Sequence, residues 1–198
     1  MDRRLVLASA SESRRRLLED AGFAPEIVPS HVDEEGVDHL KPGEAVLELA
    51  KRKARAVASK LPQGADLVLA CDSLLEIEGT APGKPLSPDE ATARWRQMRG
   101  RAGVLHTGHC VIDTATGSEA SATDGTTVWF GDPSDKEIAA YVATDEPLHV
   151  SGAFTLEGRS APWIERIEGN DGTVRGLSLP VLRRLLAELG IDLVDLWR

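Results

Sequence analysis

The sequence lacks features that mark several protein classes. It has only two cysteines, Cys71 and Cys110, each within an apolar run. That count excludes a fold held by several disulfides and favours two buried thiols in a cytoplasmic protein, while leaving one disulfide between them open. No apolar run approaches the length of a transmembrane helix, and the first residues lack the apolar segment of a signal peptide. We therefore predict a cytoplasmic protein with no membrane partner.

Positive charge is also scarce. The 198 residues include 23 lysines and arginines against 32 aspartates and glutamates, which gives a formal net charge of −9. Proteins that bind nucleic acid non-specifically normally carry a basic surface, so we predict no nucleic-acid partner. The sequence also lacks a glycine-rich P-loop and a dinucleotide fingerprint, and its five histidines show no zinc-type spacing. Most of these histidines are interpreted as structural or surface residues.

The N-terminal segment carries the most informative pattern that is present. The apolar run at residues 5–8 is followed by Ser9 and Ser11, and three arginines at 14–16 open a helical pattern. The start of a helix carries partial positive charge, so arginine is unfavourable there unless a bound anion offsets it. A polyphosphate held by Ser9, Ser11 and Arg14 would do so. The alternative is a serine cap followed by solvated arginines.

Strand-like and helix-like segments alternate along the chain. The apolar and β-branched runs predict extended segments at 4–7, 26–29, 66–71, 74–77, 104–112 and 126–130. Helical spacing predicts helices at 14–22, 42–61, 88–99, 134–142 and 180–190. Capping boxes at Ser87/Glu90 and Ser134/Glu137 mark two of the helix starts. With no repeat and no linker, we predict one α/β domain over residues 1–198.

Two carboxylates are candidates for chemistry. Asp72 directly follows the run at 66–71, at the strand end where α/β enzymes place ligands. Its carboxylate could bind a metal or accept a proton from an attacking water, or it could cap the following turn. Glu34 belongs to the acidic loop 33–35, and the sequence does not decide which of its three carboxylates faces inward. Two carboxylates plus substrate oxygens suffice for Mg²⁺ or Mn²⁺.

Two lysines supply the opposite charge. Lys53 lies on the apolar side of the helix at 42–61, so its ammonium needs an anionic partner or a route to water. Lys84 lies in the rigid turn Gly83-Lys84-Pro85. With Arg14, these lysines could clamp a triphosphate, although each could equally be an ordinary surface residue.

These segments, taken in order, resemble the Maf family of nucleoside triphosphate pyrophosphatases. The matching blocks are residues 7–18, 32–34, 49–54, 70–73, 83–85, 100–101, 107–108, 146–148, 151–154, 165–169 and 176–180. The resemblance implies a long mixed central sheet flanked by helices, with a cleft between two lobes as in inosine triphosphatases. It also implies a homodimer.

The same resemblance implies a reaction and its residues. Water would attack between the α- and β-phosphates of a nucleoside triphosphate and release the monophosphate and pyrophosphate. Asp72 would be the acid–base group, with Glu34 as the second carboxylate and metal ligand. Lys53 and Lys84 fall where the family places lysines that contact phosphate or organise carboxylates.

The preferred base rests on Glu157, which stands where the branch of the family that prefers thymidine and uridine has glutamine. A carboxylate accepts two hydrogen bonds from a guanine edge, so Glu157 with His149 favours 7-methyl-GTP. Trp129 or Trp163 could stack on its cationic base, although both are more often core residues. The alternatives are a dTTP or UTP pyrophosphatase, an inosine-triphosphatase-type enzyme, and a nucleotide-binding regulator of cell division.

The chain departs from the family pattern just before Arg14. Glu12-Ser13 stands where the family usually has Pro-Arg. One positive charge is lost and a negative charge is introduced close to the proposed phosphate site. We expect this change to affect rate and substrate choice more than the class of reaction.

Overall fold

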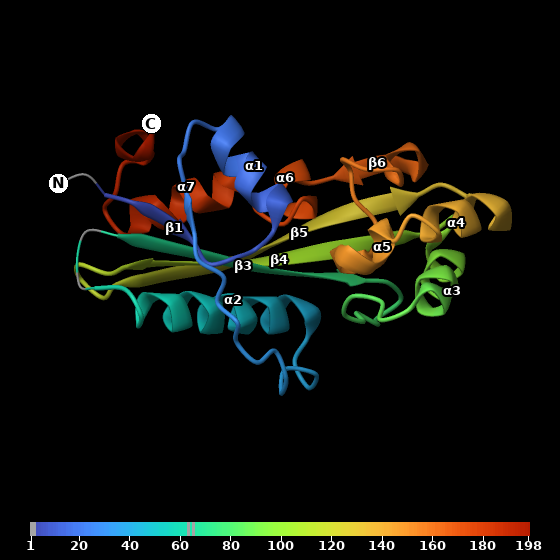
Figure 1. Ribbon diagram of the computed structural model, residues 1–198, viewed down its shortest axis with the longest axis horizontal. Coiled ribbons are helices and arrows are strands. Elements are labelled where there is room, and N and C mark those ends of the chain that lie inside the picture. The colour runs from blue at the N-terminus through green and yellow to red at the C-terminus, as the bar shows by residue number, and fades with distance from the viewer. Residues whose placement is uncertain (1–2, 63, 65) are drawn as a thin grey trace. The chain divides into compact units, whose positions relative to one another are not determined.

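The computed structural model describes residues 3–62, 64 and 66–198. These residues form a sheet in the order β2-β1-β3-β4-β5-β6 (Figure 1). Its strands are β1 (Leu5–Leu7), β2 (Glu26–Ile27), β3 (Leu67–Glu76), β4 (Ala102–Asp113), β5 (Glu119–Phe130) and β6 (Ile164–Glu168). Strand β1 pairs in parallel with β2 and β3, whereas β5 and β6 are antiparallel. The predicted mixed sheet is therefore confirmed.

Helices flank the sheet, as predicted. They are α1 (Glu12–Asp20), α2 (Pro42–Ala58), α3 (Pro88–Met98), α4 (Asp135–Val142), α5 (Glu146–His149), α6 (Asp171–Val174) and α7 (Leu179–Glu188). Short 3₁₀ turns lie at Ser151–Ala153, Ala161–Trp163 and Leu193–Leu196. Within the described ranges, no helix is both long enough and apolar enough to cross a membrane.

The chain forms two compact units. The first comprises Met1–Asp72, Thr107–Asp124 and Gly176–Arg198, and the second comprises Ser73–His106 and Gly125–Arg175. The boundaries fall inside β3, β4 and β5, so each of these strands contributes residues to both units.

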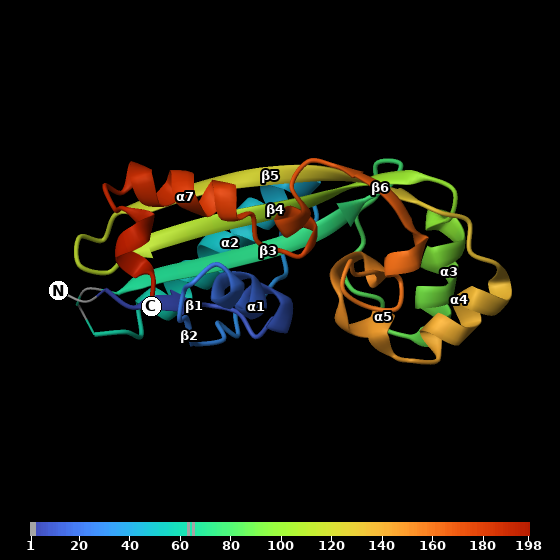
Figure 2. The same ribbon diagram turned by 90° about the horizontal axis from the view of Figure 1, so that it is seen from above.

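In the first unit, helices cover both faces of the sheet. Helix α2 lies on one face, and α1 and α7 lie on the other (Figures 1 and 2). The alternation of side chains along β3 explains this arrangement. Leu67 and Leu69 belong to the core cluster that contains Leu18 of α1, whereas Val68 packs in the cluster that contains Ala54 of α2. Because β3 is buried on both faces, its residues form the continuous apolar run seen in the sequence at 67–71.

The second unit is built around an aromatic core. Trp95 of α3 is fully buried and meets Phe130, Tyr141 and Trp163 edge to face, at centroid distances of 6.1, 5.6 and 5.3 Å. Its indole N–H donates to the Ala153 carbonyl at 2.8 Å, so the one polar atom of the ring is satisfied.

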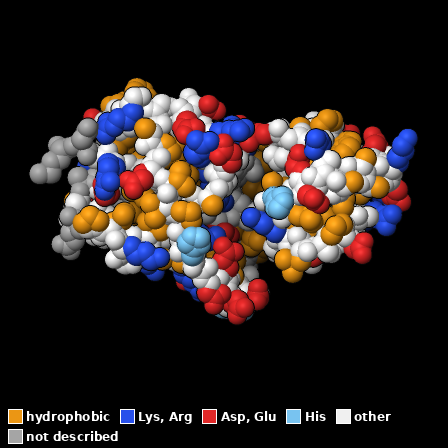
Figure 3. All heavy atoms as spheres, viewed as in Figure 1, with side chains coloured by type: hydrophobic (Ala, Val, Ile, Leu, Met, Phe, Trp, Pro, Cys, Tyr) orange, Lys and Arg blue, Asp and Glu red, His pale blue; other side chains and the backbone are white. Residues whose placement is uncertain are grey.

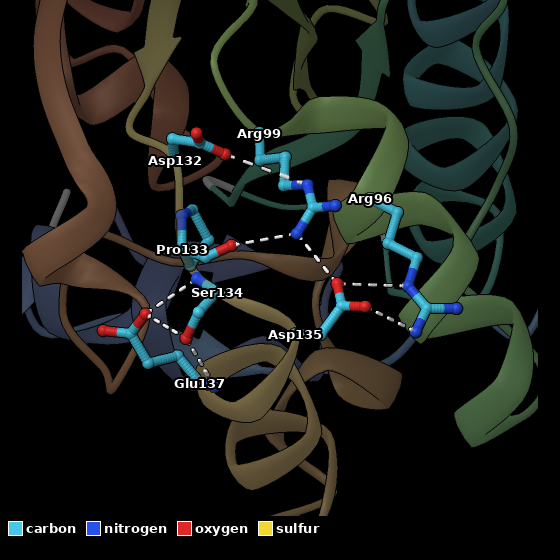
Figure 4. Close-up of polar contacts among 7 residues, drawn as sticks. All are labelled: Arg96, Arg99, Asp132, Pro133, Ser134, Asp135 and Glu137. Atoms are coloured by element: carbon cyan, nitrogen blue, oxygen red, sulfur yellow. Dashed lines mark hydrogen bonds and ion pairs between the residues drawn. The ribbon is translucent and has the colours of Figure 1, made fainter.

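The start of α4 confirms a predicted capping box (Figure 4). The Glu137 carboxylate accepts from the Ser134 backbone N–H at 2.7 Å, and the Ser134 hydroxyl accepts from the Glu137 N–H at 3.4 Å. Asp135 in the first turn accepts from Arg96 at 3.1 Å and from Arg99 at 2.8 Å. These contacts tie the start of α4 to the end of α3.

Several predicted boundaries were wrong. Helix α1 begins at Glu12 rather than at Arg14, because Ser11 is its N-cap. The segments at 66–71 and 74–77 form one strand, because the backbone stays extended through Asp72. Asp72 therefore lies within β3 and not at its end. Strand β5 begins at Glu119, seven residues before the predicted start at Thr126, and β6 was not predicted.

Candidate functional site

Three predicted site residues meet in the first unit. The Lys53 Nζ atom lies 2.5 Å from Asp72 Oδ1 and 2.6 Å from Glu34 Oε1. The side chains of Lys53 and Asp72 are only 11% and 12% exposed, whereas that of Glu34 is 60% exposed. One ammonium thus bridges a buried carboxylate and an exposed one.

The fold brings these residues together through α2 and β3. Lys53 is buried on the face of α2 that includes Ala50 and Ala54, and its head group finds the anionic partner that its position requires. In the acidic loop, Glu34 is the residue that reaches Lys53. Asp33 instead accepts a hydrogen bond from the Glu35 backbone N–H at 2.9 Å. Of the three acidic residues that the sequence left open, the ion pair with Lys53 is made by Glu34.

The environment of Asp72 is electrostatically mixed. Burial raises the pKa of Asp72 above the ordinary value for an aspartate. The positive charge of Lys53 and, more weakly, that of Arg14 oppose this rise. A buried carboxylate held beside an ammonium is suited to accept a proton.

Hydrogen bonds hold the segment before α1 in shape. The Ser11 backbone N–H donates to Ser9 Oγ at 3.2 Å, and the Arg14 N–H donates to Ser11 Oγ at 3.4 Å. The Arg14 guanidinium folds back onto this segment, with Nη1 donating to Ser9 Oγ at 3.1 Å. Its Nε donates to the Gly176 carbonyl at 2.8 Å. Arg14 therefore adds a fixed cation to the positive end of α1.

The other two arginines behave as a solvated helix face would. Arg15 pairs with Glu12 at 2.5 Å and with Glu19 at 3.0 Å, and Arg16 pairs with Glu12 at 3.0 Å. The hydrogen bond from Arg15 is the largest effect that lowers the pKa of Glu12. The negative charge that departs from the family pattern is thus neutralised by the arginines that follow it.

Asp72 and Glu34 are the candidate ligands for a divalent metal ion. Asp72 and Glu34 offer the oxygen ligands that Mg²⁺ and Mn²⁺ prefer. In the part of the chain that the structure describes, no group of three or more histidine, cysteine, aspartate or glutamate side chains could hold a metal ion. Asp72 and Glu34 alone are two ligands, so a cation bound by them would take its other ligands from substrate phosphates and water.

Lys84 and Glu157 lie in the second unit. Lys84 is exposed in the turn before α3, and Arg94, buried on α3, donates to the Gly83 carbonyl and to Glu90 at 3.0 Å. Glu157 forms an ion pair with Arg175, with side chains 32% and 18% exposed. Within this unit, Arg94 orders the turn of Lys84 and Arg175 engages Glu157.

The two candidate tryptophans for stacking on a methylated base contact other side chains of the protein. Trp163 packs edge to face against Trp95 and Tyr141, at 5.3 and 5.5 Å, so the interpretation as a core residue is confirmed for it. The guanidinium of Arg166 lies 4.3 Å from the centre of the Trp129 ring. His149 is exposed at the end of α5. The rings of Trp163 and Trp129 thus already contact other side chains of the protein.

Two residues near Arg14 were given no role by the sequence. Gly176 accepts the hydrogen bond from Arg14 at a φ of +97°. His109 is fully buried on β4, and its Nε2 accepts the Ser178 backbone N–H at 2.8 Å. The only sequence signal for His109 was a histidine inside an apolar strand, which is more typical of a structural residue.

Both cysteines are buried free thiols, which answers the question of a disulfide. Burial raises the pKa of Cys71 and of Cys110 to about 12, so both are protonated at neutral pH.

Comparison with known proteins identifies close relatives. A family model described as Maf-like protein matches residues 4–189. A protein of Streptomyces coelicolor is 60% identical over 195 residues, covering 98% of this chain and 95% of the relative. Relatives from Streptomyces avermitilis and Trichormus variabilis are 56% and 48% identical, covering 98% of this chain and 95% and 97% of their own lengths. All three carry the name nucleoside triphosphate pyrophosphatase.

Proposed function

This chain belongs to the Maf family, and we propose that it hydrolyses nucleoside triphosphates to the monophosphate and pyrophosphate. The observation that carries the proposal is Lys53 held between Asp72 and Glu34, at 2.5 and 2.6 Å. The name borne by the relatives supports the same reaction. We further propose that residues 1–198 act as one functional domain.

In this proposal, Asp72 accepts the proton of the attacking water. General-base assistance of this kind typically contributes about 10²- to 10⁴-fold to a rate. Lys53 keeps the carboxylate ionised and oriented, because its ammonium lies 2.5 Å from Asp72 Oδ1. Hydrolysis of a phosphoanhydride needs positioning and charge neutralisation more than a covalent nucleophile, which fits a site of carboxylates and cations.

The phosphates would be held by Arg14 and the segment before α1. Its guanidinium is already fixed by Ser9 and Gly176, so little side-chain freedom is left to lose on binding. The Ser9 and Ser11 hydroxyls would supply further phosphate contacts. For the second unit, the proposed phosphate ligand is the exposed Lys84. Mg²⁺ or Mn²⁺, when bound by Asp72 and Glu34, would neutralise phosphate charge. The family resemblance supports a homodimer, and the two free thiols support a reducing, cytoplasmic location.

The test is a panel of 7-methyl-GTP, UTP, dTTP and ITP, with and without Mg²⁺, in which pyrophosphate and monophosphate are both quantified. We expect equal amounts of the two products. Asp72→Asn should lower kcat at least about 100-fold. Asp66→Asn is the matched control, because Asp66 lies just before the same strand and pairs with Arg4 at 2.6 Å. Orthophosphate as the product, or a folded Asp72→Asn protein with more than about a tenth of wild-type activity, would overturn the proposal.

For the base, we propose a preference for 7-methyl-GTP. The support is the acceptor-only carboxylate of Glu157, which Arg175 holds by an ion pair. Glu157→Gln replaces one acceptor oxygen by a donor, so activity on 7-methyl-GTP should fall about 5- to 150-fold while activity on UTP is kept or raised. A wild-type preference for UTP or dTTP contradicts this assignment and leaves the reaction intact. Tight binding of all four nucleotides without turnover would favour the regulatory alternative.

A further inference from the structure

We propose that His109 is a positioning residue that fixes the phosphate-binding guanidinium of Arg14 without touching substrate. The inference rests on the proposed function, because it takes Arg14 to bind the triphosphate. It adds a specific link from the centre of β4 to the start of α1.

The link runs through the turn that precedes α7. The Ser178 backbone N–H donates to His109 Nε2 at 2.8 Å. Two residues earlier, the Gly176 carbonyl accepts from Arg14 Nε at 2.8 Å. Ser178 is the N-cap of α7, so the imidazole holds the turn at the point where it enters the helix. The position of the carbonyl that orients Arg14 therefore depends on the histidine.

Gly176 shows how closely Arg14 packs on this turn. Its φ of +97° lies in the region that favours glycine. A Cβ added there would lie 2.9 Å from Arg14 Nε. The guanidinium thus rests against the backbone itself, and a small shift of the turn would displace it.

The chemistry of the imidazole explains why a histidine, and not an apolar residue, stands at this position of β4. A backbone N–H only donates, so Nε2 is unprotonated and the neutral ring carries its hydrogen on Nδ1. Nδ1 is buried beside the backbone of Ala122 and Thr107, without a hydrogen bond of good geometry among the described residues. A poorly paired buried donor costs stability that an apolar residue would avoid. The histidine supplies what an apolar residue cannot, an acceptor for the Ser178 N–H.

The experiment compares His109→Leu, which has no acceptor, with His109→Gln, whose side-chain oxygen can restore one. The probes are the most rapidly hydrolysed triphosphate of the panel and inorganic pyrophosphate, whose binding is measured by calorimetry. For His109→Leu we expect KM and the pyrophosphate Kd to rise together, about 10-fold, with kcat changed less than about 3-fold. His109→Gln should restore both constants to within about 3-fold of wild type.

A double-mutant cycle separates positioning from general loss of structure. In an Arg14→Ala background, His109→Leu should change KM less than about 2-fold, because the group that it positions is gone. Cys110→Ala is the matched control, since Cys110 is the next residue of β4 and packs in the cluster that contains Val6. If His109→Leu does not fold, Gly176→Ala tests the same link by displacing the guanidinium directly.

The outcomes distinguish the two proposals. Equal effects of His109→Leu with and without Arg14, or a lower melting temperature with unchanged KM and pyrophosphate Kd, would overturn the role of His109. An Arg14→Ala variant with unchanged pyrophosphate binding would instead overturn the phosphate role of Arg14 on which the inference rests.

Discussion

At the scale of single residues, Lys53 is the cation that two carboxylates of the candidate site share. It lies in a buried setting on α2 and contacts Asp72 and Glu34 at 2.5 and 2.6 Å. Removing one partner of a buried ion pair leaves an uncompensated charge, which costs far more than the loss of a surface pair. The protonation of Asp72 therefore depends directly on this lysine.

This dependence predicts how Lys53→Met changes the pH profile of kcat. Burial raises the pKa of Asp72 and the Lys53 charge lowers it, so removing the charge raises it further. The base must be ionised to accept a proton, so activity should be lost at a higher pH than in wild type as the pH falls. Lys51→Met, on the same helix, is the control. An acidic limb that stays in place or moves to lower pH would contradict the role of Lys53.

The three arginines of α1 make a second prediction at this scale. Arg14→Ala should raise KM for the triphosphate about 10- to 100-fold, because a charge-assisted hydrogen bond to phosphate is lost. Arg15→Ala and Arg16→Ala should change KM less than about 3-fold, since both side chains pair with Glu12 on an exposed face. Steady-state kinetics of the three variants gives the comparison. Equal small effects at all three positions would support the interpretation as a solvated helix face.

At the scale of elements, α2 lies unusually close to β4. A Cβ added at Gly108 would lie 2.3 Å from the Val46 carbonyl oxygen. Only a residue without a side chain allows the backbone of α2 to approach the strand so closely. The same contact helps to fix the helix that carries Lys53.

We therefore expect Gly108→Ala to lower the free energy of unfolding by at least about 2 kcal/mol, because backbone must move to admit the methyl group. Gly125→Ala on β5 is the matched control, since its added Cβ would find its nearest neighbour at 3.5 Å. Urea denaturation of both variants measures the difference. Similar stabilities for the two variants would show that α2 can shift away from β4 at little cost.

Local signals explain which elements the sequence could predict. The capping box at Ser134 and Glu137 spans four residues, and the structure confirms it. Strand β6 escaped prediction because its residues are charged or only partly buried, and its pairing with β5 joins segments far apart in the chain. Strand β3 was split because Asp72 and Ser73 interrupt the apolar run, although their burial within the sheet keeps the strand continuous.

The candidate site likewise contains residues that local sequence signals identify and residues that only long-range contacts reveal. Asp72, Lys53 and Glu34 were each identified from residue type, neighbours and resemblance. Only the folded structure places the Lys53 ammonium in contact with both carboxylates. The roles of Gly176 and His109 could not be predicted, because their hydrogen bonds to Arg14 and Ser178 span 162 and 69 residues. No local pattern records such a contact.

At the scale of the whole molecule, the excess of acidic residues gives a mixed surface. Acidic and basic side chains are interspersed on the face shown in Figure 3. Acidic side chains gather at its lower edge, where Figure 1 places the loop that leads into α2. That loop includes the exposed residues Asp33, Glu34, Glu35 and Asp38. With this net charge, the proposed binding of a triphosphate would depend on local cations such as Arg14 and not on the overall charge.

Global stability should depend on pH through His109. Burial, followed by the positive charge of Arg14, lowers the pKa of His109 to about 4, while a backbone hydrogen bond with Ala122, the charge of Asp124 and a backbone hydrogen bond with Thr107 oppose the shift. Near pH 7 the imidazole is neutral in both the folded and the unfolded chain. Between about pH 6.5 and pH 4, the unfolded chain binds a proton at this residue and the folded chain does not. The free energy of unfolding therefore decreases as the pH is lowered through this range. The shift corresponds to about 3 kcal/mol, fully lost below pH 4.

Urea denaturation of wild type and His109→Gln at pH 7, 6, 5 and 4 measures this contribution. Glutamine does not titrate, so the stability of wild type relative to the variant should fall by about 3 kcal/mol from pH 7 to pH 4. Effects of all other titrating groups cancel in this difference as long as the variant keeps the fold. His39→Gln, at an exposed position, controls for the loss of a histidine as such. A difference that stays constant over this range would mean that His109 is protonated in the folded protein as readily as in the unfolded chain. A protonated ring cannot accept the Ser178 N–H, so that result would mean that the hydrogen bond, and with it the placement of Arg14, is lost below about pH 6.5 in the folded protein.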